Sequence, residues 1–329
     1  MKTIAAVEEA RVSLAGDIAV GDATPDGRVL LSGFFAAVVV DHRGVRGSWT
    51  SARDELLAAS LASDGSVAML WRVDGDSPRE ARLQVVRAGT EESRTLALSE
   101  AGVLGFDYGG GAALAWAGTD ALWLAAPHAD WTAIWVGRID ARTGATLDAS
   151  TIADPFVESR LRFARHAGPG RCALCLDAGQ SGGWAFDVRA TAAGLHLARR
   201  IASDEVTTVI ETDAHLLALE GYRLTKRDLD TASIMAELAP SDDASPLELT
   251  RGPGNLLLVE LDQGETRVVD ARAMEVRGRV AIPGLGAPAG GPISSAWMGA
   301  RRFASAQTRG VNVRRTRVVF WTLPDAAVP

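Results

Sequence analysis

Two cysteines, Cys172 and Cys175, form a CxxC motif, a spacing typical of zinc and redox sites. A tetrahedral zinc site would need a second pair of ligands, and the sequence has no third cysteine. The motif lies in RCALCL, an apolar run that predicts a β-strand. Residues three apart on a strand face opposite sides of the sheet. We therefore expect two buried structural thiols without a metal ion.

The histidines show no ligand or catalytic spacing. No HxH or HExxH motif occurs, and no DxDxDG calcium loop is present. Asparagine, whose side-chain oxygen also binds calcium, occurs only at Asn255 and Asn312. We expect no catalytic residue, metal or cofactor, although a site assembled from distant parts of the chain would leave no local motif. The five histidines are His42, His128, His166, His196 and His215.

Aromatic and arginine side chains recur in the short connections between apolar runs. Such side chains supply much of the binding energy in protein–protein interfaces. They predict a protein-binding surface, and the alternative is that each folds back onto its own loop. The candidates are Trp131 in PHADWT, Tyr222 in EGYR, Phe34 beside Phe35 in SGFFA, Arg79 in SPRE, Arg309 and Arg314 in TRGVNVRR, and Tyr108 in GFDYGGG.

The charge of the chain excludes some classes of partner. The 329 residues carry a formal net charge of −7, with a pI of about 5.4. Nucleic acids and anionic membranes both select basic surfaces, so we expect neither as a partner. Lysine occurs only at Lys2 and Lys226 among 34 basic residues, which indicates the codon bias of a GC-rich bacterial genome.

The first residues, MKTIAAVEEARVSLAG, contain two early glutamates and no apolar core, so we expect no signal peptide. No stretch approaches the 18 apolar residues of a membrane span. The expected location is the cytoplasm.

The stretch that positions these candidates is a repeated module, plainest in residues 17–50. Four short apolar runs are each closed by a Gly/Asp/Pro cluster, which predicts strands joined by turns. The first turn recurs about every 46 residues, the period of a four-stranded propeller blade. Its seven copies are centred near residues 26, 64, 119, 169, 213, 253 and 299.

An aspartate marks the turn between the third and fourth strands of several units. The clearest copies place Asp41, Asp140, Asp228 and Asp270 at equivalent positions. A carboxylate there can accept hydrogen bonds from the N–H groups of its own turn. We therefore expect a structural role for these four residues rather than a catalytic one.

The repeats predict an all-β fold, a seven-bladed β-propeller of four-stranded antiparallel blades. The seventh unit has only three strands, so we expect Thr3–Val7 to pair into it and close the ring. The prediction is a single domain over residues 1–329, with residues 1–9 in the last blade. Ser51–Leu61 is expected to form one or two helical turns between blades, with Ser51 as N-cap.

The PDG turn at 25–27 and the strand-ending VVVD at 38–41 resemble the WD40/YVTN-like β-propellers. The periodic likeness spans nearly the whole chain, but the Gly-His and Trp-Asp pairs of WD40 blades are missing. Trp49-Thr50 and Trp321-Thr322 come nearest to the Trp-Asp pair. The resemblance implies a disc with a central channel that binds proteins on the face carrying the first–fourth and second–third strand connections.

The function expected from these patterns is a non-catalytic scaffold or recognition subunit of a bacterial multiprotein assembly, with one or more proteins as partners. The alternative is a propeller hydrolase or isomerase that acts on a small molecule at the channel mouth. A third interpretation is an adaptor whose acidic surface holds a basic protein.

Overall fold

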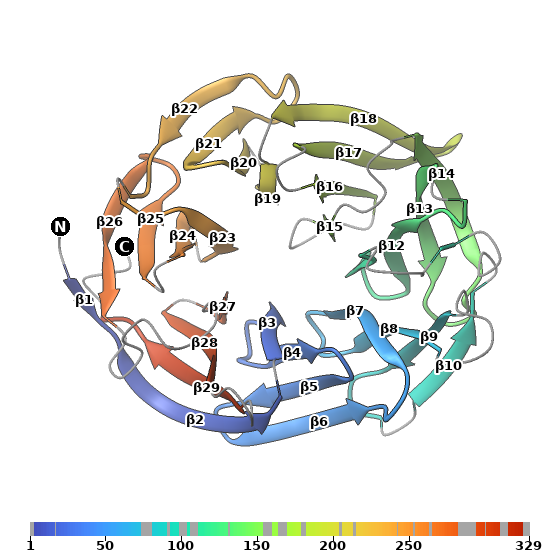
Figure 1. Ribbon diagram of the computed structural model, residues 1–329, viewed down its shortest axis with the longest axis horizontal. Coiled ribbons are helices and arrows are strands. Elements are labelled where there is room, and N and C mark those ends of the chain that lie inside the picture. Colours follow the sequence, from blue (N-terminus) through green and yellow to red (C-terminus); the bar gives the residue numbers. More distant parts are fainter. Residues whose placement is uncertain are drawn as a thin grey trace. The chain divides into compact units, whose positions relative to one another are not determined.

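The regular elements of the described chain are all β-strands, and Figure 1 shows their order in the computed structural model. The structure describes residues 3–16, 18–73, 81–90, 93–98, 104–105, 111–130, 132–153, 160–163, 170–178, 182–203, 206–212, 215–241, 243–252, 254–262, 265–281, 294–299, 301–309 and 315–324.

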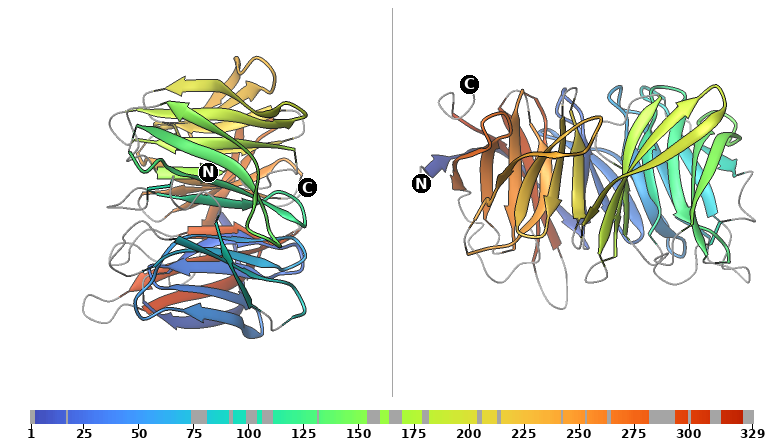
Figure 2. Two further views of the ribbon diagram at one scale, coloured as in Figure 1. Left: turned by 90° about the vertical axis from the view of Figure 1, so that its right-hand side faces the viewer. Right: turned by 90° about the horizontal axis from the view of Figure 1, so that it is seen from above.

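Seven four-stranded antiparallel blades form an all-β, seven-bladed β-propeller, which confirms the fold predicted from the repeat (Figure 1, Figure 2). In chain order the blades are β3–β6 (Ile18–Ala23, Val29–Gly33, Ala36–Asp41, Gly44–Thr50), β7–β10 (Glu55–Leu61, Val67–Arg72, Ala81–Val86, Ser93–Ala97), β11–β14 (Ala113–Trp116, Ala121–Pro127, Ala133–Asp140, Thr146–Ala153), β15–β18 (Arg160–Phe163, Arg171–Asp177, Gly183–Thr191, Gly194–Ser203), β19–β22 (Val206–Glu211, His215–Glu220, Arg223–Asp228, Ile234–Leu238), β23–β26 (Pro246–Arg251, Leu256–Leu261, Thr266–Asp270, Glu275–Ala281), and β27–β29 (Ser294–Trp297, Arg302–Arg309, Arg315–Thr322) with β2 (Val7–Ala15).

The turns between first and second strands lie where the repeat predicts them. In the first two blades they end on Gly27 and Gly65, whose φ angles are +94° and +91°. Only glycine adopts this left-handed conformation without strain, which explains the PDG and SDG sequences.

The N-terminal segment supplies the missing fourth strand of the seventh blade, as predicted, but its boundaries differ. The strand is β2, which pairs antiparallel with β29. Thr3–Ala5 forms a separate strand, β1, which pairs in parallel with β26 of the sixth blade. The buried side chain of Ile4 explains the difference, because it packs into a cluster that includes Val280 of β26.

The helix expected over Ser51–Leu61 is wrong. Ser51 Oγ does accept the N–H of Asp54, at 2.9 Å, but the chain then extends into β7. Antiparallel pairing of β7 with β8 buries Leu56 and Leu61, and this tertiary pairing overrides a weak local preference for helix.

The chain divides into two compact units. Unit 1 comprises Met1–Gly33, Ala37–Trp49 and Thr212–Pro329; unit 2 comprises Phe34–Ala36 and Thr50–Glu211. The single-domain organisation stays a prediction.

Apolar clusters between neighbouring blades stabilise each unit. In unit 1, Trp297, Phe303 and Trp321 pack in a cluster shared by the sixth and seventh blades. In unit 2, a cluster around Trp123 joins the third and fourth blades, where Phe186 packs. Large aromatic side chains thus fill the space between adjacent sheets.

Candidate functional site

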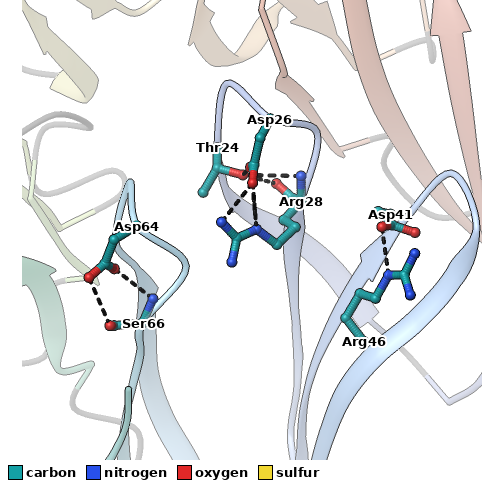
Figure 3. Close-up of polar contacts among 7 residues, drawn as sticks. All are labelled: Thr24, Asp26, Arg28, Asp41, Arg46, Asp64 and Ser66. Carbon is teal, nitrogen blue, oxygen red and sulfur yellow. Dashed lines mark hydrogen bonds and ion pairs between the residues drawn. The ribbon is translucent and has the colours of Figure 1, made fainter. Parts of the chain in front are cut away.

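The turn aspartates have the structural role that the sequence predicts. Asp41 Oδ1 accepts the N–H of Arg43 at 2.7 Å. Figure 3 shows that Arg46 donates to the other oxygen of Asp41. In the same way Asp140, Asp228 and Asp270 each accept the N–H groups of the residues two and three positions later, at 2.7 to 3.1 Å.

These hydrogen bonds also lower the pKa values of turn carboxylates. The N–H of Arg142 holds the pKa of Asp140 below its usual value, against a smaller opposing effect of burial. The N–H and hydroxyl of Thr231 do the same for the pKa of Asp228. An aspartate whose pKa is lower in the folded than in the unfolded state stabilises the fold at pH values above its unfolded pKa, near 4. This stabilisation is lost as the pH falls from there through the lower pKa of the folded state.

The turns between first and second strands hold further aspartates in the same way. Arg28 donates to Asp26 at 2.7 Å, and Thr24 also binds this carboxylate. In the second blade, Asp64 accepts the N–H of Ser66 at 2.8 Å (Figure 3). These carboxylates close their own turns, so they are not catalytic candidates.

A histidine–aspartate pair lies in the loop after β12. His128 Nδ1 is 2.7 Å from Asp130 Oδ1, and the hydroxyl and N–H of Thr132 donate to the same oxygen. The Thr132 hydrogen bonds, with that of His128, lower the pKa of Asp130 to about 2. This pattern is an Asx turn with an attached imidazole, so we assign the pair to loop structure.

The two cysteines are buried free thiols, as predicted. Cys172 packs in the cluster of the third and fourth blades, whereas Cys175 Sγ lies 3.7 Å from the carbonyl oxygen of Val206 in β19. They therefore face opposite sides of β16, and burial raises the pKa of Cys175 to about 12. Among the described residues, no group of three His, Cys, Asp or Glu is placed to hold a metal ion.

We expect native protein to react with a thiol reagent such as DTNB about 1,000-fold more slowly than a free thiol, because thiolate is scarce and access is blocked. In denaturant, two thiols per chain should react at once. Leu147→Cys, at an exposed position of β14, is the control and should add one rapidly reacting thiol. Rapid reaction of either wild-type cysteine in the folded protein would contradict the assignment.

Two of the predicted interface residues are exposed in the structure. Phe34 in the β4–β5 turn is 63% exposed, and Tyr222 in the β20–β21 turn is 66% exposed. Phe34 belongs to unit 2 and Tyr222 to unit 1. Arg309 ends β28, where its backbone pairs with Arg315. Arg79, Tyr108, Trp131 and Arg314 lie outside the described residues.

Phe34 and Phe35 form an exposed aromatic pair on an anchored backbone. Their ring centroids are 5.2 Å apart at an interplanar angle of 70°, and Phe35 is 48% exposed. The N–H of Leu56 donates to the Phe34 carbonyl at 2.8 Å, and that of Ser51 donates to the Phe35 carbonyl at 3.0 Å. The start of the second blade thus holds the turn in place while both rings face solvent.

A pocket of about 520 Å³ lies in unit 1, between turns of the fifth and sixth blades. Three basic side chains line it: Lys226, Arg251 and Arg272. Sequence reasoning missed this pocket because its residues come from separate turns. The one available signal was the rarity of lysine, since Lys226 is one of only two in the chain.

No protein-family model matches the chain, and a search of curated proteins finds no significant match. The described part of the chain contains no helix long and apolar enough to cross a membrane. The functional interpretation therefore depends on the geometry of the exposed pair and of the pocket.

Proposed function

We propose that the protein is a non-catalytic scaffold or recognition subunit of a multiprotein assembly, and that it binds a partner protein through Phe34 and Phe35. The observation that carries this proposal is the exposure of two adjacent aromatic rings on a backbone held by hydrogen bonds to the next blade.

The energetics favour an anchor at this position. Each ring leaves roughly 100 Å² of surface exposed, so covering both would contribute about 5 kcal/mol at 25 cal/mol per Å². Because the turn is held in place before binding, little further ordering of its backbone opposes association. Exposed aromatic anchors of this kind are typical of interaction hot spots.

The finer parts of the proposal come from the sequence. They are a WD40/YVTN-like kind of propeller, a bacterial source and a cytoplasmic location. The repeat pattern supports the first of these, and the arginine-rich composition supports the second.

Replacement of both phenylalanines tests the proposal. A partner protein purified with the tagged wild type should bind a Phe34→Ala, Phe35→Ala variant about 100-fold more weakly, which corresponds to about 2.8 kcal/mol. The measurement is a titration of the purified partner by calorimetry. The urea midpoint of the variant should stay unchanged, because both rings are exposed.

The matched control replaces another exposed apolar pair, Ile234→Ala with Met235→Ala in β22. It should bind the partner as the wild type does. Equal binding by the phenylalanine variant would place the interface elsewhere. Turnover of a small molecule without any stoichiometric protein partner would reject the scaffold function.

A further inference from the structure

The basic pocket of unit 1 stands out against an acidic protein with a net charge of −7. The described residues that line it include one histidine, one lysine and two arginines, and none of these described residues is an aspartate or glutamate. The lining residues are Thr212, His215, Leu217, Lys226, Arg251, Gly254, Asn255, Leu256, Leu257, Ala271 and Arg272.

Two described aspartates that are close in sequence to the lining residues accept hydrogen bonds within their own turns. Asp228, which is paired with His215 across β20 and β21, accepts the N–H groups of Asp230 and Thr231. Asp270 accepts the N–H of Arg272 and also binds Arg277 Nη2 at 2.5 Å. Among the described residues, neither carboxylate forms an ion pair with the side chain of Lys226 or Arg272.

Lys226 and Arg272 connect the two blades at the pocket. Lys226 Nζ donates to the carbonyl oxygen of Arg272 at 3.2 Å, which uses one of its three protons. Within the described residues, the Arg272 guanidinium forms no hydrogen bond or ion pair. Neighbouring cations repel one another unless an anion lies between them, so the arrangement favours a negatively charged ligand.

The rest of the pocket suits an organic ligand rather than a bare ion. A volume of about 520 Å³ lies within the range of small-molecule sites and exceeds the size of an inorganic anion. Leu217, Leu256 and Leu257 provide apolar lining, and Asn255 adds an amide that can donate or accept.

We propose that this pocket binds a small organic phosphate ester, with the phosphate between Lys226, Arg251 and Arg272 and the organic part against the leucines. A phosphate carries a charge of about −1.5 to −2 at pH 7, which suits several cations better than a single carboxylate does. Its oxygens also match the planar fork of an arginine guanidinium.

Phenyl phosphate is the probe, titrated into the full-length protein and followed by calorimetry and by ³¹P NMR. We expect saturable binding of one phenyl phosphate per chain. Inorganic phosphate lacks the organic part, and benzoate carries a smaller charge. The affinity for each should be at least about tenfold lower than the affinity for phenyl phosphate. Phenol should not bind measurably, because the cations would have no anion to hold.

Two variants locate the site. Lys226→Met with Arg272→Gln should weaken phenyl phosphate binding at least about tenfold while keeping much of the side-chain volume. Arg223→Ala removes a positive charge from the other end of β21, where Arg223 pairs with Glu237, and should bind as the wild type does. If the double variant fails to fold by circular dichroism, each single substitution is measured instead.

Lack of saturable binding at millimolar phenyl phosphate would overturn the proposal. So would an equal loss of affinity in the Arg223→Ala control, since that would show a general effect of charge. Benzoate binding as tight as that of phenyl phosphate would overturn the assignment of a phosphate ligand.

Discussion

Deletion of Met1–Ala15 is expected to abolish cooperative folding of the seventh blade. The deletion removes β2, which forms eight register pairs with β29, together with the half-buried side chains of Val12 and Leu14. At about 1 kcal/mol per hydrogen bond, the ladder and this packing contribute more than about 5 kcal/mol. That is comparable with the entire free energy of unfolding of many domains.

Side-chain contacts add to the effect of this deletion. Arg302 donates to Glu9 at 2.7 Å, and the hydroxyl of Thr322 also binds Glu9. The buried Thr316 hydroxyl donates to the Gly16 carbonyl and accepts the N–H of Ile18, which fixes the connection from the seventh blade to the first. Without β2, the edge of β29 would be exposed and prone to pair with other molecules.

Urea denaturation and size-exclusion chromatography measure the outcome. Deletion of Met1–Ala5 is the control, because it removes only β1, in which Ile4 is the buried side chain, and should cost about 2 kcal/mol. A peptide covering residues 6–16, added in trans, should partly restore the stability of the protein that lacks Met1–Ala15. An unchanged urea midpoint after deletion of Met1–Ala15 would show that β2 is dispensable.

Replacement of Asp187 by alanine is expected to lower the free energy of unfolding by about 3 kcal/mol. Asp187 in β17 is only 2% exposed, and its two oxygens accept Arg171 Nε at 2.9 Å and Arg189 Nε at 2.5 Å. The two arginines are paired across β16 and β17, so alanine leaves two guanidinium groups side by side. Breaking a buried ion pair from one side costs about 3–5 kcal/mol, and the partial exposure of both arginines places the effect at the low end.

Asp187→Asn separates charge from shape, because it keeps the volume and one acceptor oxygen, and it should cost less than alanine. Glu237→Ala is the matched control, since its pair with Arg223 is largely exposed. An exposed ion pair contributes at most about 1 kcal/mol. Equal urea midpoints for Asp187→Ala and Glu237→Ala would contradict the importance of burial.

The features that could be predicted from sequence depend on interactions between residues close in the chain. A glycine such as Gly27 is required where the backbone turns left-handed, and Asp140 binds N–H groups only two and three residues away. Repeated at a constant spacing, such turns define the number of blades and strands. The burial of Cys172 and Cys175 follows equally from the apolar run that contains them.

The incorrect expectations concern segments whose structure depends on distant partners. Ser51–Leu61 has an N-cap and a helical composition, yet β8 provides a ladder that makes a strand of its second half. The N-terminal segment divides between two blades because Ile4 finds a buried site beside β26 while Val7–Ala15 pairs with β29. The missing strand of the seventh blade predicts one of these partners, but the site of Ile4 beside β26 cannot be identified from local pattern.

From the sequence alone we could derive the repeat, the all-β class, the number of blades and the role of the turn aspartates, because each follows from local backbone geometry. Tertiary packing sets how the N-terminal residues divide between the sixth and seventh blades, which aromatic rings stay exposed at Phe34 and Phe35, and which cations meet beside Lys226. Exposure and clustering depend on residues more than forty positions apart, such as Lys226 and Arg272, whose proximity results from the packing of neighbouring blades.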